Sequence, residues 1–143
     1  MEVDYAFLAD SAEVINGKTY VMGGSIDTIW TKQVPVIYPR LSFVLRMLFE
    51  AAEMGRKHKL EIQIMDEDGN IIATVGGDME IPGKNPNAPK GWRSAILTVL
   101  NFANLQFPKF GTYNFNILAD NFSLKSIPFR IAQHVEIPGI KTN

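Results

Sequence analysis

The residues best suited to bind a metal ion lie in the segment MDEDGNII, residues 65–72. Asp66, Asp68 and Asn70 offer the carboxylate and amide oxygens that calcium prefers. The segment departs from the EF-hand pattern, because its glycine falls one place late and no glutamate follows at the twelfth position. The same residues suit a tight turn, in which an aspartate bonds the local backbone and Gly69 takes a positive φ. We therefore predict a turn, and Asp66, Asp68 and Asn70 are only a weak metal candidate.

A second group of chemically useful residues is basic and surrounds a tryptophan. If the strands after residue 58 run antiparallel, the connections 50–57, 82–92 and 119–122 meet at one end of the domain. Charged groups around an exposed indole could hold a sugar, an anionic ligand or a protein partner. This candidate ligand-binding site comprises Arg56, His58, Lys84, Lys90, Trp92, Arg93 and Asp120.

The alternative is that the basic side chains at this end are simply solvated. A lone tryptophan is usually buried, so we expect Trp92 to fold back over the core. Trp30, in the strand-like segment SIDTIW, is likewise expected to pack in the core or on a sheet face and not to bind a ligand.

Residues able to catalyse a reaction are few. His58 and His134 have no HxxxH spacing, no GxSxG motif occurs, and no glycine-rich phosphate loop follows a strand. Asp10 and Ser11 would be the first candidates for a site assembled from distant loops, but they are expected to form a turn before a hairpin. The sequence therefore predicts a protein that is not an enzyme, with no catalytic residue and no cofactor.

Composition limits the possible partners. The 143 residues are 46% hydrophobic and 20% charged, which suits one globular domain. Fourteen basic and fifteen acidic residues give a formal charge of -1, so no global field attracts nucleic acid or anionic lipid. The absence of cysteine excludes disulfides and zinc sites built on sulfur. The acidic start MEVDYAFLAD lacks the basic segment of a signal peptide, and no run approaches about 18 apolar residues. We expect a cytoplasmic protein with no nucleic-acid or membrane partner.

The elements that position these residues are predicted to be strands. Turn signals recur about every ten residues between alternating segments, which is typical of an antiparallel β-sandwich. Asn16 and Gly17 predict a type I′ hairpin, and further hairpins are expected around 66–70 and 119–122. The prolines and glycines of 82–92 predict a long loop leading into a strand over 94–102. The expected core residues are Phe43, Leu45, Leu60, Ile62, Ile64, Val99, Tyr113, Phe115, Ile117, Phe129 and Ile131.

One segment, residues 39–55 (PRLSFVLRMLFEAAEMG), fits two structures. Apolar residues at 41, 43, 45, 47 and 49 fit a strand, whereas those at 41, 44, 45, 48 and 52 fit a helix that Gly55 would end. We predict a strand over about 41–49, followed by a helical turn.

Several stretches resemble one known family. They are LADSAEVINGKTYVMGGSIDTIW (8–30), PRLSFVLR (39–46), HKLEIQIMDEDGN (58–70), and FPKFGTYNFNI with IPFRI (107–131). These blocks are similar to a family of small bacterial proteins known only as a domain of unknown function. The resemblance spans most of the chain, implies a β-sandwich and supplies no activity. The PxxGxYxF part also resembles the late strands of immunoglobulin-like and carbohydrate-binding sandwiches, where a tyrosine, here Tyr113, bonds back to the backbone at a strand corner.

The predicted fold is an all-β antiparallel sandwich, immunoglobulin-like or jelly-roll-like, over residues 1–132 with a tail at 133–143. We expect a non-catalytic protein-interaction or accessory module that could associate with itself. Clustering of exposed Val44, Leu48 and Leu118 would favour this function. The alternative is a sandwich that binds a carbohydrate or an anionic ligand at the end around Trp92, which a deep groove there would favour. A calcium-binding sandwich is the weakest candidate.

Overall fold

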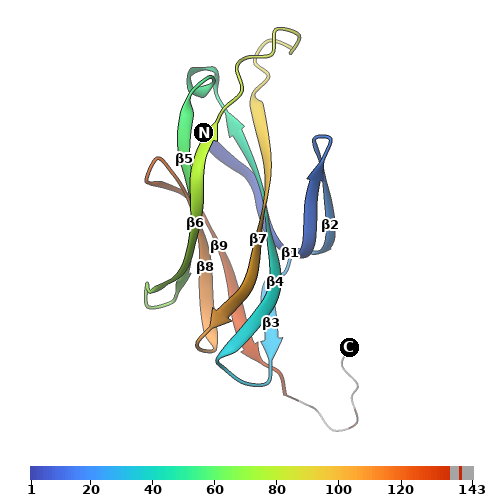
Figure 1. Cartoon of the computed structure of the whole chain (residues 1–143), viewed down its shortest axis with the longest axis vertical. Coiled ribbons are helices and arrows are strands. Elements are labelled where there is room, and N and C mark those ends of the chain that lie inside the picture. The colour runs from blue at the N-terminus through green and yellow to red at the C-terminus, as the bar shows by residue number, and fades with distance from the viewer. Residues whose placement is uncertain (136–138, 140–143) are drawn as a thin grey trace.

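A computed structural model describes residues 1–135 and 139 of the chain and shows an all-β sandwich (Figure 1). The four-stranded sheet A has the order β2-β1-β4-β7, and the five-stranded sheet B has the order β3-β9-β8-β5-β6. The strands are β1 (Glu2–Ile15), β2 (Lys18–Gly24), β3 (Thr28–Thr31), β4 (Val36–Phe49), β5 (Lys57–Asp66), β6 (Ile71–Glu80), β7 (Ser94–Phe107), β8 (Gly111–Ala119) and β9 (Phe122–Gln133). The predicted fold class is confirmed, and residues 136–138 and 140–143 of the expected tail lie outside the described residues.

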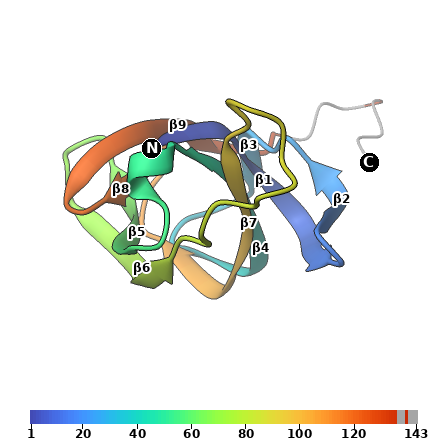
Figure 2. The same cartoon turned by 90° about the horizontal axis from the view of Figure 1, so that it is seen from above.

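The two sheets face each other, and the β1–β2 hairpin extends beyond the sandwich to one side (Figure 2). The short strand β3 pairs with β9 in parallel, whereas the other strand pairs in the described part of the chain are antiparallel. The prediction of an antiparallel sandwich therefore holds except at this one edge. At this edge of sheet B the early strand β3 therefore lies beside the last strand, β9.

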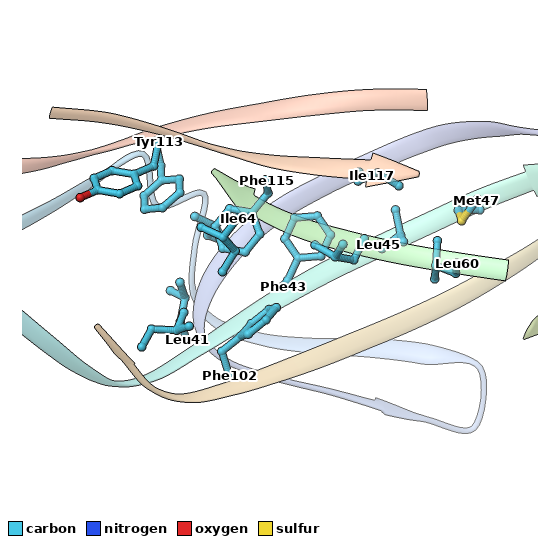
Figure 3. Close-up of a cluster of buried hydrophobic side chains, with 14 of the residues drawn as sticks. Leu41, Phe43, Leu45, Met47, Leu60, Ile64, Phe102, Tyr113, Phe115 and Ile117 are labelled. Atoms are coloured by element: carbon cyan, nitrogen blue, oxygen red, sulfur yellow. The ribbon is translucent and has the colours of Figure 1, made fainter. Parts of the chain in front are cut away.

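The core lies between the inner faces of the sheets, where side chains of β4 meet those of β5 and β8 (Figure 3). Phe43 stacks on Phe115 with ring centroids 5.1 Å apart, and Phe129 contacts Phe115 at 5.0 Å. All the predicted core residues are buried except Val99. Val99 is half-buried and lies opposite Val44 on the outer face of sheet A, so its assignment to the core was wrong.

The predicted hairpins are confirmed by backbone angles. Asn16 and Gly17 have φ of 50° and 72°, as a type I′ turn requires, and Asp120 and Asn121 have φ of 50° and 67°. The ambiguous segment 39–55 is a strand: β4 ends at Phe49 and a 3-10 turn, η1 (Ala51–Glu53), follows. The alternative of a helix over 41–54 is therefore excluded.

Two local predictions are wrong. Asp10 and Ser11 lie inside β1 and not in a turn, because this strand continues to Ile15 at the Asn16–Gly17 hairpin. The strand predicted over 94–102 continues to Phe107, where Asn104 takes a φ of 53° within the strand. After Phe102 the next buried residue is Leu105, so this local bend keeps apolar side chains on the inner face.

Candidate functional site

The acidic turn between β5 and β6 is held by one buried carboxylate. Asp66 Oδ1 accepts hydrogen bonds from the backbone N–H groups of Asp68 and Asn70, both at 2.9 Å. Asp66 Oδ2 accepts a third from Asn70 Nδ2 at 3.1 Å. Gly69 has a φ of 83°, as predicted for this turn. The Asp66 carboxylate therefore organises the turn backbone.

Electrostatics around this turn favour the ionised carboxylate. Burial alone would raise the pKa of Asp66, but hydrogen bonds from Asn70 and Asp68 together with nearby Lys109 lower it below its ordinary value. Lys109 comes from the β7–β8 connection, and its ammonium lies 2.5 Å from Asp68 Oδ2. The β5–β6 and β7–β8 connections therefore share one end of the sandwich, and a cation faces the carboxylates there.

At the opposite end of the sandwich, the residues of the predicted ligand-binding site fall into separate groups. His58 Nδ1 lies 2.7 Å from Asp120 Oδ2, and His58 Nε2 lies 3.2 Å from the backbone oxygen of Glu53. Both ring nitrogens thus face oxygen acceptors, and only the protonated imidazole can donate to both. The hydrogen bond to Asp120 raises the pKa of His58. The His58–Asp120 pair links the start of β5 to the β8–β9 turn and therefore has a structural role.

Trp92 lies in the other group and is 70% exposed, so the expectation that it folds back over the core is wrong. The reason is its place in the loop 82–92, which leaves the sandwich before β7 begins. A depression of about 390 Å³ beside it is lined by Met54, Lys84, Asn85, Pro89, Trp92 and Arg93. Arg93 pairs with Glu2 at 2.7 Å and with Glu50 at 3.3 Å, so part of its charge is compensated. Arg56 and Lys90 do not line this depression, and they are not part of the His58–Asp120 pair.

Trp30 is also exposed, at 59%, so the expectation that it packs in the core is wrong. It projects from β3 at the edge of sheet B, with the Arg130 guanidinium carbon 5.6 Å from its ring centroid. The sequence did not indicate this exposure, because β3 gains its edge position only by pairing with β9.

The outer face of sheet A carries an apolar row, a feature that the sequence analysis did not identify. Strand register places Phe7, Val44 and Val99 in one row across three strands, and Tyr5, Arg46 and Leu97 in the next. Val44 is 1% exposed although no further sheet packs on this side in the described part of the chain. Leu118 lies in sheet B, whereas Val44 and Leu48 lie in sheet A, so these three residues do not form the cluster that would favour an interaction module.

Strand β7 forms the free edge of this face. Its fourteen residues, SAILTVLNFANLQF, include no charged residue, proline or glycine. The other edges are protected: β3 has four residues, β2 carries Lys18, and β6 carries a pair of glycines followed by Asp78 and Glu80. An apolar groove of about 310 Å³ opens between β6 and β7 and is lined by Leu60, Ile62, Val75, Thr98 and Leu100 among others.

In the described part of the chain, few side chains converge as a metal site or a catalytic site would require. Among residues 1–135 and 139, no three His, Cys, Asp or Glu side chains gather as a metal site would require. No helix there is long and apolar enough to cross a membrane. Asp10, the first candidate for a catalytic carboxylate, lies beside Gly23 of the neighbouring strand segment.

The family model described as "Family of unknown function (DUF6941)" matches residues 4–132. The chain belongs to this family. Comparison with curated proteins found no match. Among solved structures, this DUF6941 chain is similar to a β-glucuronidase from glycoside hydrolase family 2, at 17% sequence identity and a TM-score of 0.32. The match covers 65% of this chain and 10% of that chain, so the DUF6941 chain spans only a small part of the enzyme's length.

Proposed function

We propose that this DUF6941 chain is a non-catalytic protein-interaction module that associates through edge strand β7, with a second copy of itself as the partner. The observation that carries the proposal is the uncharged, fourteen-residue edge of β7. Natural sheets protect long edges with charges, prolines, bulges or short strands, because unpaired backbone groups there can pair with another chain. The positive φ at Asn104 is the one such irregularity in β7, and it lies near the end of the strand.

A two-fold axis would place two β7 strands antiparallel and join both copies of sheet A into one continuous sheet. No like charges would meet along β7, whatever the register, because the strand carries none. The apolar row of Phe7, Val44 and Val99 would continue across the junction. This arrangement would satisfy the free backbone groups of β7.

The test is sedimentation velocity over a range of protein concentrations. The wild-type chain is expected to form a dimer, and the double substitution Leu97→Lys with Val99→Lys is expected to give a monomer, since lysines on an edge strand oppose pairing. Asn114→Lys, on the outer face of sheet B, is the control and should leave the dimer intact. A wild-type chain that stays monomeric at every concentration would contradict self-association.

A crosslinking experiment locates the contact. Because the chain has no cysteine, single substitutions Leu97→Cys, Val99→Cys and Asn101→Cys place one thiol along β7. At least one should give a disulfide-linked dimer, since paired strands bring opposite residues within disulfide range. Asn116→Cys on sheet B should give none. Dimer formation by Asn116→Cys alone would move the interface to sheet B.

The second candidate is an anionic-ligand site at the Trp92 depression. The exposed indole and the nearby cations Lys84 and Arg93 support it. Titration with inorganic phosphate and with citrate, followed by tryptophan fluorescence in a Trp30→Phe background, tests it. Binding lost in Lys84→Ala would support an anion site there, and an unchanged spectrum would exclude these anions as ligands.

The topology also supports an immunoglobulin-like assignment within the sandwich class. The Tyr113 hydroxyl in β8 donates to the backbone oxygen of Lys109 at 2.7 Å, which is the corner bond typical of such domains. Interaction through sheet edges and faces is common to many such domains and needs no catalytic group. A cytoplasmic location and the absence of a nucleic-acid or membrane partner stay predictions.

A further inference from the structure

We propose that the outer face of sheet B around Trp30 is a binding platform for a neutral oligosaccharide, separate from β7 and from the Trp92 end. Trp30 is 59% exposed and borders an open depression of about 760 Å³. The depression is lined by Ser25, Asp27, Thr28, Thr112, Trp30 and Arg130 among others. An exposed indole with hydroxyl, carboxylate and guanidinium groups beside it matches a ligand that has both apolar C–H faces and many hydroxyls.

Strand register brings these groups to one face. Thr28 of β3 lies opposite Arg130 of β9, which lies opposite Thr112 of β8, so the three form a row across the sheet. Trp30 lies two residues along β3, next to Ala132. Since alternate residues of a strand share a face, Thr28 and Trp30 project on the same side. A flat ligand could therefore contact the indole and the polar row together.

The polar groups are held in place before any ligand binds. Arg130 Nε donates to Thr28 Oγ1 at 3.0 Å, and Thr28 Oγ1 donates to Asp27 Oδ1 at 3.0 Å. The backbone N–H of Arg130 donates to the backbone oxygen of Asp27 at 2.9 Å. Arg130 also stacks over Trp30, which restrains both side chains. Such preorganisation lowers the entropy that binding must overcome.

The charges in the depression determine the ligand class. One guanidinium, of Arg130, and one carboxylate, of Asp27, line the depression, so neither an anion nor a cation is favoured over a neutral molecule. Arg130 retains terminal N–H groups that can donate to sugar hydroxyls, and the Asp27 carboxylate can accept from them. The open shape suits a ligand lying along the sheet face, with contacts over a small area and modest affinity.

The experiment uses the full chain and a panel of probes: cellopentaose, xylopentaose, maltopentaose and penta-N-acetylchitopentaose. Saturation-transfer-difference NMR measures binding of each sugar. At least one sugar should bind the wild-type chain, and Trp30→Ala should weaken that binding by roughly tenfold or more, which equals about 1.4 kcal/mol. Trp92→Ala, which removes the other exposed indole, is the matched control and should bind as the wild type does. Its loop, 82–92, lies at the opposite end of the molecule from β3 (Figure 1).

A second measurement places the sugar at the indole. The chain has two tryptophans, so Trp92→Phe leaves Trp30 as the one fluorophore of this type. The bound sugar should shift its emission, and Thr28→Val with Asp27→Asn should reduce binding while leaving the melting temperature close to that of the parent. The proposal is overturned if no sugar of the panel binds the wild-type chain, or if binding survives unchanged in Trp30→Ala.

Discussion

The outer faces of the two sheets carry opposite chemistry at equivalent places. Across sheet A a central row is Phe7, Val44 and Val99, whereas across sheet B a central row is Gln63, Asn116 and Ser126. The inner faces of both sheets are apolar and meet in one core, so folding alone does not require this difference. A solvated outer face is normally polar, as in sheet B. The apolar row of sheet A agrees with the protein contact proposed at β7.

The sheet edges follow the same division. Sheet A ends in the uncharged strand β7, whereas sheet B ends in the short β3 and in β6, which carries Asp78 and Glu80. The proposed protein contact and the proposed sugar platform thus lie on different sheets. Variants of one sheet's outer face should leave the function of the other unchanged.

The substitution with the largest expected effect on stability, Tyr113→Ala, tests whether both sheets share one core. Tyr113 is fully buried, contacts Phe107 from sheet A and Phe129 from sheet B, and bonds to Lys109. Tyr113→Ala should lower the free energy of unfolding by about 3–5 kcal/mol, because it leaves a cavity between the sheets. Urea denaturation followed by circular dichroism measures the loss.

Tyr113→Phe separates the hydrogen bond from the packing. It keeps the ring and removes the bond to the Lys109 backbone, which should cost about 1 kcal/mol. Equal stability of the wild type and both variants would refute the corner role. Two separate unfolding transitions would show that the sheets do not share a core, and the comparison of their outer faces would lose its basis.

A reciprocal exchange tests the two outer faces directly. Val44→Thr places a hydroxyl at a position 1% exposed and should destabilise by about 1–2 kcal/mol, since a buried hydroxyl without a partner is unfavourable. Thr112→Val, on the exposed face of sheet B, should change stability by less than about 0.5 kcal/mol. Thermal or urea unfolding of both variants gives the comparison. Equal effects would mean that the faces do not differ in burial as described.

The same difference explains what the sequence could and could not predict. Glu61 and Gln63 alternate with buried Ile62 and Ile64, so the faces of β5 were assigned correctly. In β7 both faces are apolar, and alternation therefore could not separate outward Val99 from inward Leu100. The apolar outer face that supports the proposed function is thus what caused the error at Val99.

Local turn chemistry was predictable, whereas the placement of the tryptophans was not. Asn16 and Gly17 determine their turn through their own φ preferences. Trp92 is exposed because a long loop carries it away from the core, and Trp30 because β3 pairs at an edge. Both depend on contacts between segments far apart in the sequence. Hence the acidic turn was interpreted correctly, and the two exposed indoles were not.

A smaller effect is expected from His58, whose pKa is raised by its hydrogen bond to Asp120. A raised pKa in the folded state adds stability below the ordinary value of 6.5, and this contribution is lost as the pH rises through the folded-state pKa. The pKa of Asp120 is lowered by the same bond, so its carboxylate stays ionised over this range. The wild type should therefore exceed His58→Gln in melting temperature by more at about pH 5.5 than at about pH 8.

The control for this pH effect is Lys109→Gln at the other end of the sandwich. Lys109 stays charged at both pH values, because its hydrogen bond to Asp68 raises its pKa further. Its substitution should lower the melting temperature equally at both. A difference between wild type and His58→Gln that grows with pH would contradict the assignment of a protonated His58 to this pair.

The smallest expected effect is that of calcium on the acidic turn, which should be none. A ligand that binds only the folded state would add about 2.7 kcal/mol at a hundredfold excess over its dissociation constant. Asp66 already accepts three hydrogen bonds, and Lys109 pairs with Asp68. Millimolar calcium should therefore leave the melting temperature unchanged.

Substitutions within the turn distinguish its structural role from metal binding. The hydrogen bonds that Asp66 accepts show that its carboxylate holds the turn backbone. Asp66→Asn should lower the melting temperature more than Asp68→Asn, which loses only an exposed pair. Gly69→Ala should also be harmful, because its φ of 83° strains any Cβ. A rise of several degrees with calcium that disappears in the double variant Asp66→Asn with Asp68→Asn would instead make this turn a calcium site.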